Sequence, residues 1–239
     1  MKNKFSIIIP FGKRAELLPR AVNSILSQTY PEWELIIVDD GTEMDVEGLL
    51  PKDNRIKVLH QAHLNRIYAQ NMGMEAAVGD WLCLLDSDDA YMPHYLEACN
   101  QFIEEFPEYK LFNFGSIVFS AKGTRGSELF NESHLREVFE HEDFAEFRGG
   151  VIAQGNFIFH RLAFQDVGPM PPSTSPYGFA DEMKKRFPDL LKSYGPLYRE
   201  GGKELGNPWG NDFALYFMLT RKYKHKTIPL HLYIQYAHL

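Results

Sequence analysis

Residues 81–89 read Trp81-Leu82-Cys83-Leu84-Leu85-Asp86-Ser87-Asp88-Asp89, an apolar run that ends in a cluster of carboxylates. An unbroken apolar run of this length predicts a short strand that is buried on both faces, as strands of parallel sheets are. Alternate residues of an extended chain point the same way, so Asp86 and Asp88 are placed to face one ligand together. The run therefore predicts a buried strand with a polar site at its carboxyl end.

Earlier apolar runs of similar length are separated by segments with helical spacing. The runs are Ser6-Ile7-Ile8-Ile9, Leu35-Ile36-Ile37-Val38 and Ile56-Lys57-Val58-Leu59. Helices are expected at residues 17–26, where Pro19 fits a first turn, at residues 65–77, and after Pro93. Apolar strands that alternate with helices predict an α/β protein whose parallel sheet is covered on both faces. Ligands of such sheets bind beyond the carboxyl ends of the strands, so we expect the functional site there.

The second half of the chain is less regular. Strands are expected at residues 111–119, 156–159 and 230–236, and helices at residues 133–147 and 211–220. Residues 167–209 are rich in Pro, Gly and Tyr. Long irregular stretches inside compact domains are often binding loops or lids, so this segment is a candidate for one.

Length and composition are those of one globular domain. The chain has 239 residues, of which 44% are hydrophobic and 24% charged. Its formal net charge of -7 argues against a nucleic-acid-binding protein, which usually has a basic face. Two cysteines, Cys83 and Cys99, do not support a disulfide framework, and Cys83 is expected to be a buried, reduced thiol.

The sequence predicts no membrane-spanning segment. No stretch approaches the roughly 20 apolar residues that a span needs, and the first residues do not form a signal peptide. We therefore expect a cytoplasmic protein, with peripheral association at the inner face of a membrane through a partner or an acceptor.

Three loops that follow predicted strands each have two interpretations. Asp86 to Asp89 offers hard oxygen ligands for Mg²⁺ or Mn²⁺, which hold nucleotide phosphates, or it is a solvated acidic turn. Asp39-Asp40-Gly41-Thr42 offers an acceptor for a ribose hydroxyl or a base N–H, or it is a plain Asp-Gly turn. Pro10-Phe11-Gly12-Lys13-Arg14 lines a nucleotide pocket, or it is a helix entry with solvated basic residues.

The order of these motifs resembles the family-2 glycosyltransferases of GT-A fold. The resemblance rests on the first strand (6–10), the helix at 21–30, the second strand (33–42), the helix motif at 71–81, and Leu85-Asp86-Ser87-Asp88-Asp89, which matches the DxD motif. It covers about residues 4–95 closely. Each motif is weak alone, but together in this order and spacing they are specific.

The resemblance implies a Rossmann-like GT-A fold, with a mixed, mostly parallel central sheet flanked by helices. It implies a single domain over residues 1–239. About residues 1–110 form a half that binds a nucleotide-sugar donor, and about residues 111–239 form a half that binds the acceptor.

The resemblance also implies roles for single residues. Asp39 contacts the base or ribose, with Pro10 and Phe11 beside the nucleoside. Asp86 contacts ribose or sugar, and Asp88 is the principal ligand of Mn²⁺ or Mg²⁺, with Asp89 nearby. The family often has Arg where this chain has Gln70, so Arg66, one turn earlier, is placed to reach the diphosphate. The expected donor-binding residues are Pro10, Phe11, Asp39, Arg66, Asn71, Asp86 and Asp88.

The later half matches the family more thinly. Residues 209–215 resemble the acidic motif that supplies the catalytic base, although Asn211 replaces the usual Glu. Asp212 is the candidate base, and a helix cap is its alternative role. His238 resembles a late metal ligand of related enzymes, and a satisfied or exposed histidine is the alternative. Aromatic residues of the irregular segment form an acceptor platform or pack the loop onto the domain; they are Tyr177, Phe179, Tyr194, Tyr198 and Trp209.

The implied reaction is a metal-dependent, inverting transfer of a sugar, with UDP-sugar as the default donor. The implied acceptor is a hydroxyl on a saccharide or a lipid-linked saccharide, and polysaccharide synthesis for the cell envelope is the setting by analogy. A catalytically silent nucleotide-sugar-binding or scaffold module is the alternative that Asn211 keeps open. A sugar nucleotidyltransferase would need a Gly-rich, basic loop after the first strand, and a dinucleotide dehydrogenase would need G-x-G-x-x-G. The sequence has neither.

Overall fold

The computed structural model describes residues 2–120, 123–126, 156–170, 211–220 and 222–236. Within these residues nine strands form one sheet, in the order β3-β2-β1-β4-β8-β6-β9-β5, with β7 paired to β6. The helix predicted at residues 133–147, most of the irregular segment and its five aromatic residues lie outside the described residues.

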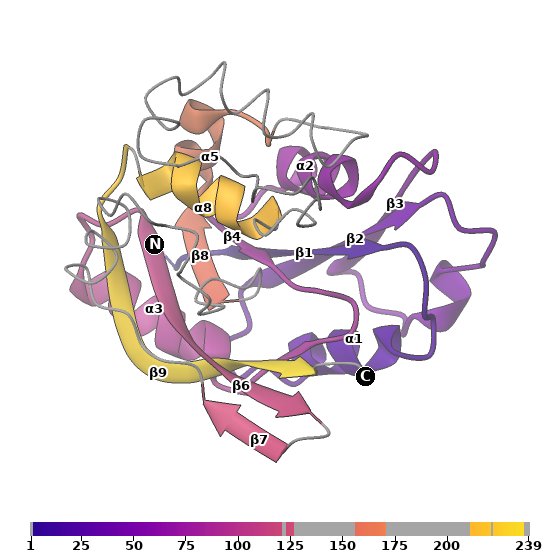
Figure 1. The fold of residues 1–239 in the computed structure, drawn as a ribbon, viewed down its shortest axis with the longest axis horizontal. Helices are drawn as coiled ribbons and strands as arrows, with labels where there is room; N and C mark the ends of the chain where they lie inside the picture. The colour runs from indigo at the N-terminus through magenta and orange to yellow at the C-terminus, as the bar shows by residue number, and fades with distance from the viewer. Residues whose placement is uncertain (1, 121–122, 127–155, 171–210, 221, 237–239) are drawn as a thin grey trace, which may run out of the picture.

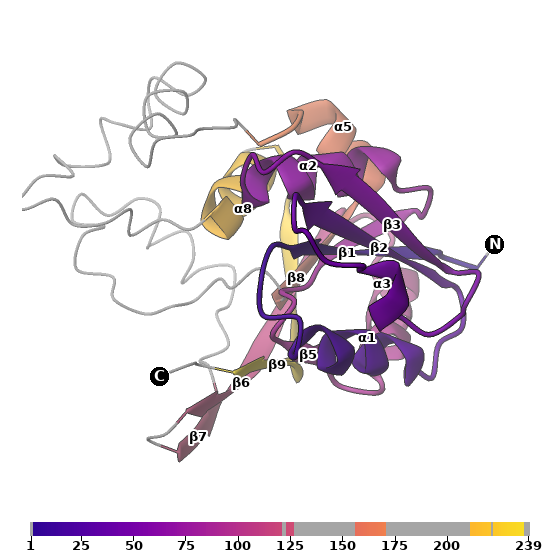
Figure 2. The same ribbon diagram turned by 90° about the vertical axis from the view of Figure 1, so that its right-hand side faces the viewer.

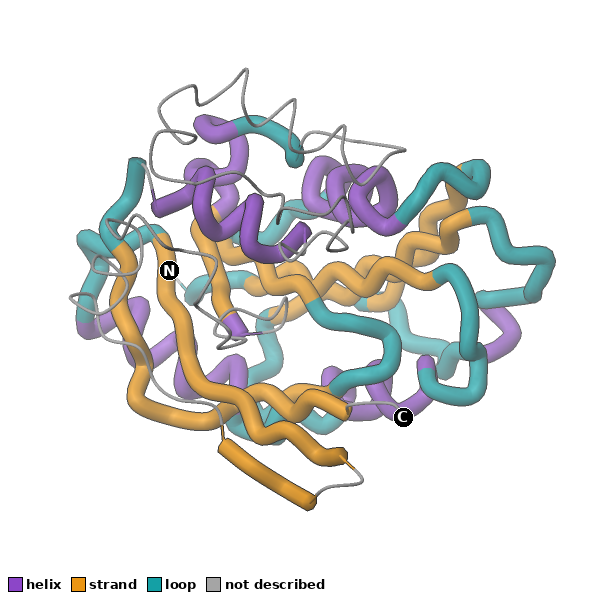
Figure 3. The backbone as a smooth tube through the Cα atoms, in the orientation of Figure 1, coloured by secondary structure: helices purple, strands orange, loops and turns teal. Residues whose placement is uncertain are grey.

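The first half of the sheet is parallel. Strands β2 and β4 pair with the two edges of β1, and β3 pairs with β2. Figure 3 shows this sheet as a layer between two groups of helices. The strands of this half are β1 (Phe5–Phe11), β2 (Trp33–Asp40), β3 (Ile56–Gln61) and β4 (Trp81–Leu84). The predicted strands are confirmed, with small differences at their ends.

One of these differences concerns β1, which continues through Phe11 rather than ending before Pro10. Proline lacks the N–H that a central strand would donate. Here the pairing of β1 with β4 ends at Ile8, while Pro10 and Phe11 pair only with β2. Pro10 is therefore tolerated because β1 has become an edge at that point.

Helices cover both faces of the sheet, as predicted. Alternating residues of β1 point to opposite faces: Ile7 and Ile9 pack in one core cluster and Ile8 in the other. Helices α1 (Leu18–Leu26) and α3 (Tyr95–Glu105) contribute to the first cluster. Figures 1 and 2 show α2 (Arg66–Ala76), α5 (Arg161–Val167) and α8 (Asn211–Thr220) on the opposite face.

Glycine allows α2 to approach the sheet closely. A Cβ added at Gly73 would lie 2.4 Å from a methyl carbon of Ile8 and 3.2 Å from one of Val38. No side chain fits at such distances, so packing against the sheet requires glycine at position 73 of the Asn71-Met72-Gly73 motif. The close approach fixes where the first turn of α2 lies relative to the strands.

The second half of the sheet is mixed. Strands β8 (Phe157–His160) and β7 (Gly123–Gly126) are antiparallel to β6 (Leu111–Ser120), and β9 (His225–Tyr236) is parallel to it. β9 is longer than the predicted strand at 230–236. It also pairs with β5 (Ala90–Tyr91), directly after the acidic cluster, an arrangement the sequence did not predict.

The sequence prediction about the cysteines is tested by the described residues. Cys83 and Cys99 are buried free thiols, as expected. No helix in the described ranges is long and apolar enough to cross a membrane.

Candidate metal and nucleotide site

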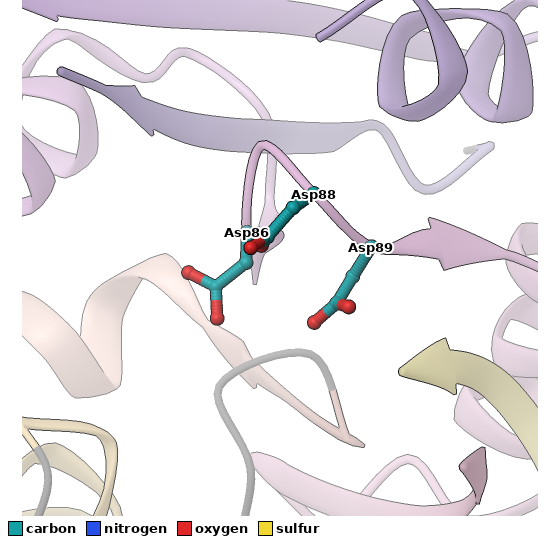
Figure 4. A group of neighbouring side chains, drawn as sticks. All are labelled: Asp86, Asp88 and Asp89. Atoms are coloured by element: carbon teal, nitrogen blue, oxygen red, sulfur yellow. The ribbon is translucent and has the colours of Figure 1, made fainter. Parts of the chain in front are cut away.

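The acidic residues lie in the loop between β4 and β5. Each of Asp86, Asp88 and Asp89 places a carboxylate oxygen within 4.8 Å of the other two. Figure 4 shows the three side chains extending to the same side of the loop. A set of hard oxygen ligands at this spacing fits Mg²⁺ or Mn²⁺, which bind proteins through a few carboxylates and water.

Two arginines, one from a loop and one from the first turn of a helix, contact this cluster. The Arg14 guanidinium, from the loop between β1 and α1, is 2.5 Å from a carboxylate oxygen of Asp88. The Arg66 guanidinium, at the start of α2, is 2.7 Å from a carboxylate oxygen of Asp86. The arginine side chains are 40% and 42% exposed, so each pair is expected to contribute about 1 kcal/mol or less. Such pairs are weak enough to exchange for stronger ligands.

A third arginine holds the backbone of the loop. Arg20, in α1, donates a hydrogen bond to the main-chain carbonyl of Asp88. Its guanidinium carbon also lies 3.5 Å from the centre of the Tyr236 ring, a cation–π contact. Arg20 therefore joins the acidic loop to the end of β9.

Asp89 differs from its two neighbours because it is buried. Its carboxylate accepts hydrogen bonds from the Tyr233 hydroxyl and, at 2.8 Å, from the Tyr236 N–H. Burial raises the pKa of Asp89 to about 6, although these hydrogen bonds act in the opposite direction. A metal ion at Asp89 would compete with both bonds, so its predicted role as a ligand stays a prediction.

Asp39 lies at the carboxyl end of β2, next to the end of β1. Only 3% of the residue is exposed, and its carboxylate accepts a hydrogen bond of 3.0 Å from the Thr42 N–H. The imidazole of His60 is 3.2 Å from its other oxygen. β1 separates β2 from β4, and all three run parallel, so Asp39 and the acidic loop lie at the same edge of the sheet.

Sequence reasoning did not identify His60. Its imidazole lies between two carboxylates, with Nε2 2.9 Å from Glu47 and Nδ1 3.2 Å from Asp39. The hydrogen bonds that the ring donates, first to Glu47 and then to Asp39, raise the pKa of His60, because both carboxylates favour the protonated ring. The sequence offered one sign of this contact: His60 follows the predicted third strand, and that strand pairs with β2, which carries Asp39.

Other predicted donor-binding residues have structural contacts. The Asn71 side chain donates to the Met170 carbonyl at 2.7 Å and accepts from the Met170 N–H at 3.0 Å, so it joins α2 to the chain after α5. Pro10 is buried, and Phe11, 1% exposed, packs in the core. Contacts of these residues with a nucleotide stay predictions.

The two remaining predicted residues lie in the second half. Asp212 is the second residue of α8, but its side chain lies outside the described part of the chain. His238 lies wholly outside it. α8 packs through Leu215 and Leu219 on the same face as α2, while the roles of Asp212 and His238 stay predictions.

The functional residues that sequence reasoning missed are therefore cations and tyrosines. Arg14 was noted only as a basic residue of a loop, and Arg20 and Tyr233 were not considered. Arg14 follows a strand at the same sheet edge, which is a usable signal. Tyr233 becomes relevant only through the pairing of β5 with β9.

Solved structures with a similar fold bind nucleotide sugars. Staphylococcus aureus TarS 1–349, solved in complex with UDP-GlcNAc, superimposes with a TM-score of 0.66 at 16% sequence identity. The match covers 99% of this chain and 59% of that one. At this identity the likeness establishes the fold alone, and the fold is that of the GT-A glycosyltransferases.

Curated relatives match over part of their length. One is the GalNAc(5)-diNAcBac-PP-undecaprenol beta-1,3-glucosyltransferase of Campylobacter jejuni, 30% identical over 64% of this chain and 54% of its own length. Another is the glycosyltransferase GlyG of Streptococcus pneumoniae, 33% identical over 44% of this chain and 36% of its own. An uncharacterized glycosyltransferase of Rickettsia conorii is 36% identical, but the chain covers only 17% of it.

The sequence pattern that defines Glycosyl transferase family 2 matches residues 6–168, more than half of the chain. The chain therefore belongs to glycosyl transferase family 2, and the family resemblance of its motifs is confirmed.

Proposed function

We propose that this protein transfers a sugar from a nucleotide diphosphate sugar, with UDP-sugar as the donor, to a hydroxyl of an acceptor saccharide. The observation that carries the proposal is the group of three carboxylates at the end of a central parallel strand. Such a group lies where α/β sheets bind their ligands. Family membership and the UDP-GlcNAc complex of a structural neighbour support the same class of donor.

The donor site is proposed at the carboxyl edge of β1, β2 and β4. Asp39 accepts a hydrogen bond from the ribose or base, in a nucleoside pocket whose wall includes Pro10 and Phe11. Asp86 contacts the ribose or the sugar, and Arg66 contacts the diphosphate. His60 holds the Asp39 carboxylate in place through its 3.2 Å contact. Asn71 supports this pocket by fixing α2 to Met170.

The carboxylates fit a divalent cation, either Mn²⁺ or Mg²⁺. Asp88 is the proposed principal ligand, with Asp89 and His238 as further candidates. When bound, the cation neutralises the diphosphate and stabilises the charge that develops as the nucleotide leaves. Arg20 and the β9 tyrosines keep the acidic loop in the position that this binding requires.

The proposed reaction is a single displacement that inverts the anomeric centre. Asp212 removes the proton from the acceptor hydroxyl as that oxygen attacks the anomeric carbon. Its place at the start of α8 supports this role, because it would lie at one end of a helix packed on the sheet. Holding both substrates in place removes much of the entropic barrier, a contribution of roughly 7–11 kcal/mol in favourable cases.

The proposed acceptor is a saccharide or a lipid-linked saccharide. The name of the Campylobacter relative, a glucosyltransferase acting on an undecaprenol-linked saccharide, supports a lipid-linked acceptor. An acceptor of this kind would place the enzyme at the cytoplasmic face of a membrane.

The first experiment is a calorimetric titration with UDP in the presence and absence of Mn²⁺, followed by a screen of donors for nucleotide release. We expect metal-dependent UDP binding, and transfer to a lipid-linked acceptor that Asp212→Asn removes while UDP binding survives. Asp53→Asn is the control, because Asp53 also pairs with an arginine but precedes β3 at the opposite edge. Wild-type protein that binds no nucleotide with either metal would contradict the proposal. UDP binding without transfer to any acceptor would favour the silent module.

A further inference from the structure

The two segments that present arginines to the acidic cluster, a loop and the start of α2, have unusual backbones. In the described part of the chain the non-glycine residues with positive φ are Arg14, at 62°, and Asn65, at 153°. Positive φ is costly for residues with a Cβ, and such strain gathers at functional sites. Arg14 itself contacts Asp88, and Asn65 immediately precedes Arg66, which contacts Asp86.

Each of these conformations has a local hydrogen bond, and at Arg14 it is the one that its carbonyl accepts from the Leu17 N–H at 3.0 Å. Asn65 caps α2, since its side chain accepts hydrogen bonds from the N–H groups of Ile67 and Tyr68. The Arg14 side chain also forms the ion pair with Asp88, 2.5 Å long. The fold therefore directs a guanidinium onto the carboxylate that we propose as the principal metal ligand.

A guanidinium and a divalent cation compete for the same carboxylate. Three neighbouring carboxylates repel one another, so a protein without a bound cation gains from a positive side chain among them. Arginine keeps its charge at all relevant pH values and cannot yield by deprotonation. The guanidinium must therefore leave the carboxylate when a divalent cation binds, unless another anion nearby balances its charge.

We propose that Arg14 is an internal counter-ion of Asp88 that yields this carboxylate to the divalent cation and then binds the diphosphate of the donor. Arg66 acts in the same way at Asp86. The inference rests on the proposed function, and it adds a donor-binding residue, Arg14, and an order of events. Metal and donor then promote each other's binding, because the donor's phosphates accept the arginines that the metal displaces.

Removal of Arg14 must change two affinities in opposite directions. Mn²⁺ alone binds Arg14→Gln about twofold to fivefold more tightly than wild type, because an ion pair worth about 1 kcal/mol or less no longer competes. UDP in saturating Mn²⁺ binds the same variant about tenfold more weakly, because a charge-assisted hydrogen bond to phosphate is lost. A residue with a purely structural role would weaken both.

The experiment measures free Mn²⁺ by electron paramagnetic resonance during titration of the full chain, without UDP and with it. Arg14→Gln and Arg66→Gln are tested separately, so that one misfolded variant does not decide the result. Arg55→Gln is the matched control: Arg55 also pairs with an aspartate, Asp53, at 2.7 Å, but lies at the amino edge of the sheet. Its Mn²⁺ and UDP affinities are expected to equal those of wild type.

Each outcome decides the inference. Opposite shifts in the two affinities for either site variant support it. Equal shifts, or unchanged Mn²⁺ affinity in both variants, overturn it while leaving the proposed function intact, provided that wild type binds UDP with Mn²⁺. Wild-type protein that binds neither would overturn the proposed function and this inference together.

Discussion

Carboxylates at the two edges of the parallel sheet are held in different ways. At the amino edge, Glu34 accepts hydrogen bonds from the Ser6 hydroxyl at 2.6 Å, the Val78 N–H at 2.8 Å and the Lys57 ammonium at 2.8 Å. At the carboxyl edge, Asp88 contacts Arg14 from a loop and Asp86 contacts Arg66 from the first turn of α2. The partners of Glu34 belong to strands or to the close turn between α2 and β4. The difference separates a carboxylate that holds elements together from carboxylates that are placed to exchange partners.

The exposure of the side chains agrees with this distinction. The Glu34 side chain is 3% exposed, whereas those of Asp88 and Asp86 are 15% and 25% exposed. Burial would raise the pKa of Glu34, but its hydrogen bonds with Lys57, Ser6 and the Val78 N–H outweigh burial and lower it. Its charge is thus compensated by three donors, of which the Ser6 hydroxyl and the Val78 N–H belong to the packed fold. Asp88 itself is more exposed than Glu34 and pairs with an arginine from a loop.

The largest effect is expected from Asp88→Asn. We expect metal-dependent release of nucleotide from the donor to fall at least about 100-fold, because an amide is a poor ligand for a hard cation. The melting temperature should change little, since the lost partner is an exposed arginine. Initial rates and thermal unfolding measure the two quantities. If Asp88→Asn lost its fold along with its activity, Asp88 would be a stabilising carboxylate like Glu34, and the distinction between the two edges would be wrong.

Glu34→Gln should show the reverse pattern. Its amide group would face the Lys57 ammonium, two donors with no acceptor, so the free energy of unfolding should fall by about 1–3 kcal/mol. Denaturant unfolding measures this loss. Metal-dependent UDP affinity should stay within about twofold of wild type, because a factor of two is less than 0.5 kcal/mol. A large change in UDP affinity would show that the two edges are not independent.

Tyr233→Phe should lie between these two cases. It removes the hydroxyl that donates to the buried Asp89 carboxylate, leaving the Tyr236 N–H as the remaining partner from β9. We expect a loss of about 1 kcal/mol of stability together with a weaker affinity for Mn²⁺, because the acidic loop is less firmly held. Tyr109→Phe, at a ring packed beside Phe112 rather than at the acidic loop, is the control. Unchanged Mn²⁺ affinity would show that the contact between Tyr233 and Asp89 does not influence the metal site.

The smallest effect concerns pH and His60. Glu47 and then Asp39 raise the pKa of His60, so the folded protein binds this proton more tightly than the unfolded chain does. The stabilisation is fully present below the unfolded pKa of about 6.5 and is lost as pH rises through the higher folded value. The difference in free energy of unfolding between wild type and His60→Gln should therefore be larger at about pH 6 than at about pH 9. Denaturant unfolding at the two pH values measures it. A difference independent of pH would mean that the contact does not depend on the charge of the ring.

The sequence alone determined the parallel half of the sheet and the place of the acidic residues. Apolar runs of fixed length, a helical spacing over residues 65–77 and acids after two strands are local patterns, and local patterns predict strands, helices and their ends. The sequence also placed Asp39 and Asp88 at one edge, because parallel strands have their carboxyl ends together.

Only the tertiary structure decided which groups surround these acids. Arg14, Arg20 and Arg66 reach them from separate elements, and Tyr233 is 144 residues from the Asp89 that it contacts. Such contacts depend on strand order and on the pairing of β5 with β9, which spacing along the chain does not encode. Strand β9 is itself stabilised by packing and by its neighbours' hydrogen bonds rather than by a local pattern, which is why its length and its role were not predicted.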